Sequence, residues 1–298
     1  MQSLLQNKLN NKAGRGKSPA QIWVVQATDG AEGKIYRQQI RSDVVAAEEP
    51  LEIRIAEPRK TLAVTMRTPG ADFDLVAGFL FSEGIVKCRE DIRQMSYCVD
   101  RSIDGEQREN IINVRLSPES VANWLGNWGG LDRHFFTNSA CGVCGKASIE
   151  ALQLRVPRLD DDLAVAPEVI YSLPEQLAKA QGLFRATGGL HAAALFDDRG
   201  KLLQLREDVG RHNALDKLIG ASLLASELPW HRRLVMVSGR SSFEILQKCA
   251  VAGVAIVCAV SAPSSLAVSL AREFGITLVG FLRGHKFNVY SGIERICQ

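Results

Sequence analysis

Two cysteines separated by two residues, Cys141 and Cys144, carry the strongest chemical signal in this sequence. They lie in the run NSACGVCGK, and an apolar-periodic stretch follows from Ala147, so both thiols are expected in a loop that leads into a helix. Free N–H groups and the positive dipole end at a helix N-terminus favour thiolate over thiol. A reactive pair with this spacing serves metal binding, redox exchange or sulfur carriage.

The rest of the sequence helps to distinguish between metal binding, redox exchange and sulfur carriage. A structural zinc site needs four ligands, and no second pair of this spacing or closely spaced histidine pair is present. Between the two cysteines stand Gly142 and Val143, not the aromatic residue or proline of familiar thioredoxin-type dithiols. A buried, inert pair is disfavoured because Gly, Asn and Ser surround it. A persulfide carrier, in which a loop cysteine holds sulfur as Cys–S–SH, fits best, while zinc stays an alternative.

The amino-acid composition limits the classes of protein to which the chain could belong. The chain has 298 residues, 46% of them hydrophobic and 23% charged, with a net charge of +3 and seven cysteines. The basic residues are spread along the chain, which argues against nucleic-acid binding. Residues 1–20 are expected to form a disordered tail without the apolar core of a signal peptide, and no apolar stretch is long enough to span a membrane. We therefore expect a cytoplasmic protein with reduced thiols.

Hydrophobic periodicity divides the remainder into two parts. Residues 21–156 are predicted to form a smaller α+β part that ends in the CxxC loop, and residues 157–298 an α/β domain. In the second part, the apolar strands lack alternation, which indicates a sheet covered on both faces and hence three layers. The predicted strands of the first part are 21–26, 51–55, 62–66, 95–99 and 111–116, with helices at 73–81 and from Pro118. Those of the second part are 191–196, 202–205, 234–237, 255–260, 276–281 and 287–290, with helices at 168–181, from Asp208 as N-cap, at 243–251 and at 266–274.

Two loops in the second part have ligand-binding character. Ser238-Gly239-Arg240-Ser241 and Ser261-Ala262-Pro263-Ser264 each follow a strand and precede a helix. Helix N-termini with small hydroxyl residues bind anions, and open α/β sheets bind ligands at the carboxyl ends of their strands. The alternative is that the serines only cap the helices, with Ser241 and Glu244 spaced as a capping box.

Several segments together have a highly specific combination of residues. They are AGFLFSEGIV (77–86), CGVCG (141–145), GLHAAA (189–194), EDVGRHNALDK (207–217), SGR (238–240), AVSA (259–262) and TLVGF (277–281). On these segments the chain, from about residue 51 to residue 296, resembles the formate dehydrogenase accessory sulfurtransferases, the FdhD family. The run EDVGRHNALDK is the most specific of them.

The resemblance implies a fold and a function. The fold would be a three-layer, cytidine-deaminase-like C-terminal unit with a smaller α+β N-terminal part, and the protein would be a cytoplasmic homodimer. It would take sulfur from a cysteine desulfurase and pass it to the molybdenum bis(molybdopterin guanine dinucleotide) cofactor before that cofactor enters formate dehydrogenase. Cys141 matches the persulfide-bearing cysteine, and Cys144 would assist relay or resolution.

The resemblance also implies a cofactor site. The matching stretch is Phe281, Leu282, Arg283, Gly284, His285 and Lys286. From the residues themselves, Ser238, Arg240 and Ser261 are further expected partners, because a dinucleotide carries pyrophosphates that suit helix N-termini and cations. The protein would bring no metal ligands of its own. Some relatives have a cysteine where this chain has Gly189, so no third thiol is expected there.

Alternatives and accessory residues complete the prediction. Zinc-dependent deamination is disfavoured because His191 is followed by two alanines where that chemistry needs His-x-Glu. A chaperone that binds and inserts the cofactor without sulfur transfer, and a structural zinc module, remain alternatives. His191 could move protons or bind phosphate, whereas His212 is expected to be buried. Glu207, Asp208 and Arg211 are expected to form an ion-paired turn that fixes a helix start.

Overall fold

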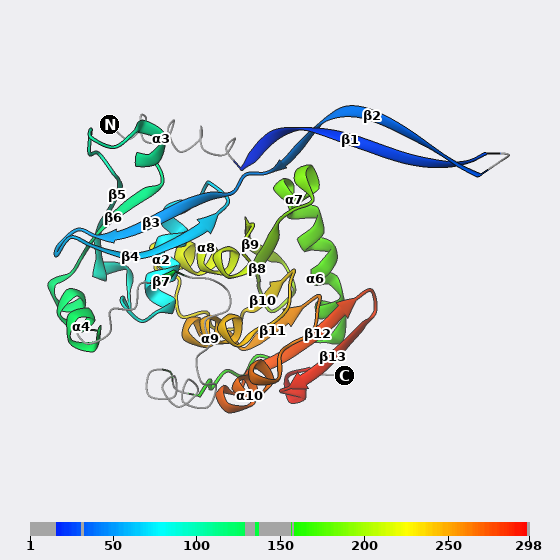
Figure 1. Ribbon diagram of the computed structural model, residues 1–298. Coiled ribbons are helices and arrows are strands. Elements are labelled where there is room, and N and C mark those ends of the chain that lie inside the picture. Colours follow the sequence, from blue (N-terminus) through cyan, green and yellow to red (C-terminus); the bar gives the residue numbers. More distant parts are fainter. Residues whose placement is uncertain (1–15, 31–32, 129–134, 137–155, 157, 297–298) are drawn as a thin grey trace.

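A six-stranded sheet forms the centre of the molecule (Figure 1). The computed structural model describes residues 16–30, 33–128, 135–136, 156 and 158–296. The strand order is β13-β12-β11-β10-β8-β9, with β10, β11 and β12 parallel and an antiparallel hairpin at each edge. The strands are β8 (His191–Phe196), β9 (Leu202–Asp208), β10 (Leu234–Val237), β11 (Ile256–Ala259), β12 (Thr277–Arg283) and β13 (Lys286–Ser291).

Helices cover both faces of this sheet. On one face lie α8 (Arg211–Leu224), α9 (Phe243–Ala252) and α10 (Ser265–Phe274), and on the other α6 (Pro167–Ala180), followed by the short α7 (Gly182–Thr187). Successive residues of a strand alternate between the faces, so Val235 joins the core under α8 to α10 while Met236 joins the core under α6. The three-layer prediction is thus confirmed, while the likeness to cytidine deaminases stays a prediction.

A second sheet belongs to the N-terminal part. Its order is β5-β6-β3-β4-β7, formed by β3 (Glu49–Ile55), β4 (Lys60–Arg67), β5 (Ile92–Tyr97), β6 (Ile111–Leu116) and β7 (Phe135–Phe136). The helices of this part are α2 (Asp72–Ser82), α3 (Gly105–Arg108) and α4 (Pro118–Trp128). Two 3₁₀ turns, η1 (Arg89–Asp91) and η2 (Ile293–Arg295), complete the described elements. No helix in the described ranges has both the length and the apolar character needed to cross a bilayer.

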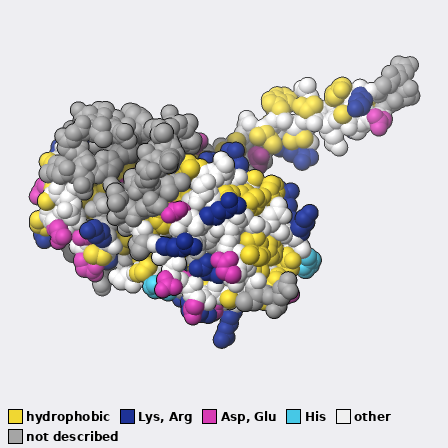
Figure 2. All heavy atoms as spheres, turned by 90° about the horizontal axis from the view of Figure 1, so that it is seen from below, with side chains coloured by type: hydrophobic (Ala, Val, Ile, Leu, Met, Phe, Trp, Pro, Cys, Tyr) yellow, Lys and Arg dark blue, Asp and Glu magenta, His cyan; other side chains and the backbone are white. Residues whose placement is uncertain are grey.

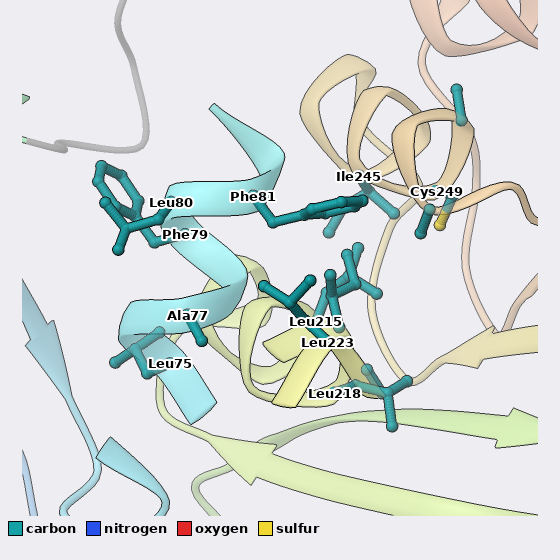
Figure 3. Close-up of a cluster of buried hydrophobic side chains, with 14 of the residues drawn as sticks. Leu75, Ala77, Phe79, Leu80, Phe81, Leu215, Leu218, Leu223, Ile245 and Cys249 are labelled. Carbon is teal, nitrogen blue, oxygen red and sulfur yellow. The ribbon is translucent and has the colours of Figure 1, made fainter. Parts of the chain in front are cut away.

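The two parts share one hydrophobic core through α2. Figure 3 shows Phe81 of α2 pointing toward Ile245 of α9, with Leu215 of α8 nearby, and all three belong to one buried cluster. The close approach of α2 and α8 depends on two glycines. A Cβ at Gly78 would overlap the carbonyl oxygen of Asp216, and a Cβ at Gly220 would overlap the backbone of α2. The helices therefore touch backbone to backbone, and the boundary predicted near residue 156 does not separate two cores.

The chain before residue 47 differs from the prediction. Strands β1 (Lys17–Gly30) and β2 (Gly33–Ala46) form a separate antiparallel two-stranded sheet that projects from the body (Figure 1). Residues 17–20, assigned to a disordered tail, belong to β1, and the strand predicted at 21–26 does not join the sheet of β3 and β4. The reason is that β1 pairs with β2, whose mixed polar sequence does not indicate a strand.

Most predicted elements of the α/β domain are confirmed within a residue or two, but one helix starts later than expected. Helix α8 begins at Arg211 with Gly210 as its N-cap, not at Asp208. Asp208 instead ends β9, paired with His191, and its carboxylate accepts hydrogen bonds from the backbone N–H groups of Thr68 and Gly210. Its side chain thus links the two parts of the chain and does not cap a helix.

Candidate functional site

Three predicted segments meet where the parallel strands end. The backbone of Ser241 forms a parallel bridge with Pro263 and accepts a hydrogen bond from Ser264 N at 3.0 Å. Ser261 O in turn accepts a hydrogen bond from Phe281 N at 3.3 Å. The loops after β10 and β11 and the C-terminal end of β12 are therefore neighbours at one edge of the sheet, as expected for the carboxyl ends of parallel strands.

A pocket of about 320 Å³ opens at the end of this row, lined by Phe281, Arg283, Lys286 and Asn288. Phe281 is 43% exposed and has a φ of 54°. The left-handed region is unfavourable for a bulky residue, so the surrounding turn must hold it there. An exposed aromatic ring beside an amide and two cations suits a flat heterocyclic base that carries phosphates.

The residues of the predicted cofactor stretch, 281–286, have different structural roles. Phe281, Arg283 and Lys286 line the pocket. Leu282 is buried among the residues under α6, and His285 packs edge-on against Tyr171 with ring centroids 5.4 Å apart. Gly284 has a φ of 53° and allows the tight β12–β13 turn. The turn is thus anchored on α6 while its cations face outward.

Three exposed cations lie at this edge of the sheet. In the part of the chain that the structure describes, Arg240, Arg283 and Lys286 are exposed and form no ion pair. On the face seen from below, positive and negative side chains are interspersed (Figure 2). Cations without partners at a strand-end pocket are available to an anionic ligand.

The serines of the first loop act differently from the prediction. Ser238 Oγ accepts a hydrogen bond from Ala192 N at 2.9 Å and so fixes the loop to β8. The capping box of Ser241 and Glu244 is wrong, because α9 starts after Ser242. Ser241 is fully buried with no hydrogen-bond partner for its hydroxyl in the described residues. The Glu244 carboxylate lies 2.9 Å from His212 Nε2, and this hydrogen bond lowers the pKa of Glu244.

A second polar cluster adjoins this loop. A Cβ at Gly239 would lie 3.3 Å from His191 Nδ1 and 3.7 Å from Arg211 Cδ, so the three residues pack together. Burial lowers the pKa of His191, and the nearby charges of Arg211 and His212 lower it further. Arg211 Nε is buried and has no hydrogen-bond partner among the described residues. An imidazole whose pKa is lowered, and a guanidinium whose Nε has no partner among the described residues, therefore lie beside the strand-end loop.

The ion-paired turn predicted for Glu207, Asp208 and Arg211 is wrong. Glu207 accepts the backbone N–H groups of Leu183 and Phe184 at the start of α7. Asp208 pairs at 2.7 Å with Lys217, and both side chains are almost completely buried. These carboxylates hold the fold together, and Arg211 is left without them.

Cys141 and Cys144 lie outside the described residues. The described cysteines Cys88, Cys98, Cys249 and Cys258 are free thiols. Burial raises the pKa of Cys249 and of Cys258 to about 12, so neither forms a thiolate readily near neutral pH. Within the described ranges, no three His, Cys, Asp or Glu side chains gather closely enough to hold a metal ion.

Sequence reasoning missed two residues of this region, Asn288 and Tyr171, and gave a third, Arg211, a different role. Asn288 lies opposite Gly280 in the β12–β13 hairpin, so a correct hairpin register would have found it. Tyr171 comes from α6, which is distant in sequence, and no local pattern points to it. Arg211 lies within the EDVGRHN run, but the sequence does not reveal that Glu207 and Asp208 bind other groups and not Arg211.

Comparison with known proteins gives a consistent result. Residues 46–297 match the model of the FdhD/NarQ family, starting where β2 ends. Proteins named sulfur carrier protein FdhD are 48% identical over 276 residues in Streptomyces avermitilis (92% of this chain, 94% of that protein) and 48% over 262 residues in Mycobacterium tuberculosis (86% and 92%). A crystal structure described as a candidate formate dehydrogenase accessory protein from Desulfotalea psychrophila superimposes with a TM-score of 0.66 at 26% identity, covering 93% of this chain and 99% of that one.

Proposed function

Because the chain belongs to the FdhD/NarQ family, we propose that it carries sulfur to the molybdenum cofactor of formate dehydrogenase. The donor is a cysteine desulfurase, the carrier residue is Cys141, and the acceptor is the bis(molybdopterin guanine dinucleotide) form of the cofactor. The observation that carries the proposal is the strand-end pocket, where an exposed aromatic ring adjoins cations that have no acidic partner among the described residues.

The sulfur-loading step is a thiol–disulfide-type exchange. The Cys141 thiolate attacks the outer sulfur of the desulfurase persulfide, a new S–S bond forms at Cys141, and the desulfurase cysteine leaves as a thiolate. No net oxidation or reduction occurs. The position of the pair ahead of a predicted helix favours the thiolate that this step requires.

Release of the sulfur as sulfide requires two electrons. Attack of the Cys144 thiolate on the inner sulfur would form the Cys141–Cys144 disulfide and expel HS⁻ toward the cofactor, so the cysteine pair supplies the electrons. A dithiol reductant must then restore both thiols before the next cycle. This step would account for the position of the second cysteine, three residues after the first in the sequence.

The acceptor would bind at the strand-end pocket. Phe281 would stack on a guanine, while Arg283 and Lys286 would neutralise the phosphates. Arg240 and the helix N-terminus capped by Ser264, whose hydroxyl accepts the N–H of Ala267 at 3.2 Å, would extend the same positive edge. The molybdenum ion belongs to the cargo, and this protein contributes the surface that orients it.

Mass spectrometry tests the carrier residue. After incubation with a cysteine desulfurase and free cysteine, one additional sulfur atom should appear on Cys141. Cys141→Ala should abolish this adduct, whereas Cys88→Ala, which removes an exposed cysteine elsewhere, should not change it. Undiminished sulfur loading of Cys141→Ala would refute the assignment, and an active formate dehydrogenase produced with this variant would favour the chaperone alternative.

Calorimetric titration with GDP tests the pocket independently. Lys286→Gln should weaken GDP binding by about tenfold or more, since a charge-assisted hydrogen bond contributes about 1.5–3 kcal/mol. Lys201→Gln is the matched control, because Lys201 is also exposed but lies in the turn at the opposite end of the sheet. Equal affinities of the two variants would refute the pocket as the nucleotide site.

A further inference from the structure

Arg211 and His191 lie beside the loop after β10 and do not line the strand-end pocket. Both side chains adjoin Gly239, because a Cβ there would lie 3.3 Å from His191 Nδ1 and 3.7 Å from Arg211 Cδ. The same loop contacts His212, whose Nε2 is 3.2 Å from Ser242 Oγ. Three side chains that can carry positive charge therefore surround one loop at the strand-end edge.

The guanidinium of Arg211 has hydrogen-bonding capacity that the protein does not use. A guanidinium carries five N–H donors in a planar fork. The Nε of Arg211 is buried, and no group in the described ranges accepts its hydrogen bond. Buried polar groups in folded proteins nearly always have a partner, so an unsatisfied donor calls for an explanation. An anion bound to this side chain supplies one.

The acids near Arg211 are engaged by other groups. The Asp208 carboxylate pairs with Lys217 at 2.7 Å, and Glu244 Oε2 lies 2.9 Å from His212 Nε2. Among the described residues, neither carboxylate is left to neutralise the guanidinium. A cation without an acidic partner favours the binding of an anion, most strongly where part of the side chain is shielded from water.

Glycine at position 239 keeps the space beside the imidazole open. Its φ is not in the left-handed region, so the backbone there does not require glycine. What the position excludes is a side chain, since a Cβ only 3.3 Å from His191 Nδ1 would press against the ring. The absence of a side chain at Gly239 thus preserves the surroundings of both His191 and Arg211.

The charge of this cluster matches a singly charged anion. Arg211 carries one positive charge at every physiological pH. Burial, with the charges of Arg211 and His212, lowers the pKa of His191, which favours the uncharged imidazole near pH 7. Asp208 opposes this shift only weakly, and His212 is paired with Glu244. A phosphate group, with close to two negative charges, would be less well neutralised here than a monoanion.

The cluster lies on the same edge of the sheet as the pocket but apart from it. Strands β8, β10, β11 and β12 are successive neighbours, so the start of β8 at His191 is three strand spacings, roughly 14 Å, from β12. Phosphates bound at the pocket have nearer cations in Arg283 and Lys286. The pocket and the cluster can therefore be occupied at the same time.

The described strand that comes before Cys141 in the sequence runs toward the same region. β7 is parallel to β4 and pairs with its middle. Further along β4 in that direction, Met66 O accepts a hydrogen bond at 2.7 Å from Nδ2 of Asn213, which lies two residues after Arg211 in α8. In the sequence, Cys141 follows Phe136, the last residue of β7, by five residues.

We propose that Arg211 and His191 bind the hydrosulfide ion that leaves the cysteine pair, an assignment of the ligand that rests on the proposed function. When Cys144 attacks the persulfide on Cys141, the leaving sulfur takes the electron pair of the broken S–S bond and departs as HS⁻. Arg211 stabilises this anion by charge-assisted hydrogen bonding, and no further proton or electron is exchanged. The ion is thus held at the strand-end edge, beside the bound cofactor.

NMR titration with sodium hydrosulfide under anaerobic conditions tests the proposal on the full chain. The protein carries Cys141→Ala and Cys144→Ala, so that sulfide cannot react with the cysteine pair. Hydrosulfide should shift the ring signals of His191 saturably, whereas sodium chloride of the same ionic strength should not. Adding Arg211→Gln should weaken hydrosulfide binding at least about tenfold, because a charge-assisted hydrogen bond is lost. Arg199→Gln, which changes an exposed arginine in the β8–β9 turn, is the matched control and should leave the affinity unchanged.

Gly239→Ala tests the site without removing a charge. Its backbone conformation suits alanine, so this variant should fold, but the added methyl group should weaken hydrosulfide binding by crowding His191. Should Arg211→Gln fail to fold, as judged by circular dichroism, Gly239→Ala decides.

Three results would each overturn the proposal. They are the absence of a saturable shift with hydrosulfide, equal affinities of Arg211→Gln and Arg199→Gln, and tighter binding of inorganic phosphate than of hydrosulfide, which would make the cluster a phosphate site. Sulfur loading of Cys141 in the otherwise unaltered protein is measured separately. If loading fails while hydrosulfide still binds, the carrier assignment falls and the anion site stands.

Discussion

The crossing of α2 and α8 yields a sharp prediction, because it joins the two parts of the chain at a point with no room for a side chain. A Cβ at Gly78 would lie 2.6 Å from the carbonyl carbon of Asp216 and 2.9 Å from Gly220 N. Ordinary contacts between carbon atoms are about 3.5–4.0 Å, so Gly78→Ala must push the helices apart by about 1 Å. The obstructing atoms are backbone and cannot move aside by changing rotamer.

The expected loss of stability follows from two opposing effects. Overpacking a well-packed site costs about 1–3 kcal/mol, and the rigid obstruction here places Gly78→Ala at the upper end of that range. Alanine returns about 1 kcal/mol through its higher helix propensity. We therefore expect the free energy of unfolding to fall by about 2 kcal/mol, and Gly220→Ala to behave similarly because it meets the backbone of α2.

Urea unfolding followed by far-ultraviolet circular dichroism measures this difference. The matched control is Gly182→Ala, the first residue of α7, where a Cβ would meet nothing within 4 Å. It should leave the free energy of unfolding unchanged or raise it by up to about 1 kcal/mol. If Gly78→Ala proves as stable as Gly182→Ala, the close helix crossing does not exist in solution and the reasoning is refuted.

Three further predictions concern buried or partly buried ionisable groups. The Asp216 carboxylate is buried and lies 2.8 Å from Lys248 Nζ, so Lys248→Met leaves it without its cation and should lower the free energy of unfolding in urea by about 3–5 kcal/mol. Adding Asp216→Asn to this variant should restore part of the lost stability. If the losses of the two single variants simply add, the two residues are not paired. The pKa of His191 is lower in the folded than in the unfolded chain, so on acidification the unfolded chain binds a proton first. The free energy of unfolding should therefore fall as the pH drops below about 6.5, until His191 of the folded chain is protonated as well. NMR titration should show this pKa rising toward its ordinary value in Arg211→Gln, and an unchanged pKa would remove Arg211 as a cause. Cys258, with a pKa of about 12, should resist alkylation at pH 8 until urea unfolds the chain, and rapid labelling of the native protein would contradict its burial.

Local sequence patterns predicted most of the strands and helices, and they supplied the proposed chemistry of the CxxC loop. The strands at 191–196 and 234–237 and the helix at 118 were predictable because alternation, apolar runs and helix periodicity are properties of neighbouring residues. The resemblance to the FdhD family was likewise recognisable in the sequence and is confirmed by the family match over residues 46–297. The roles of Cys141 and Cys144 rest on their spacing and stay predictions.

Contacts between distant segments were decided only by the tertiary structure. Asp208 could have served as a helix cap by its position, yet its carboxylate pairs with Lys217 and accepts the backbone N–H of Thr68, so it does not pair with Arg211, whose Nε has no hydrogen-bond partner among the described residues. Of the six residues 281–286, the structure turns three toward the pocket and one into the core under α6. Glycine's role at position 78 depends on a helix more than a hundred residues away. Periodicity records which face of an element is apolar, but the partner that covers that face is fixed by register and packing, which no local pattern encodes.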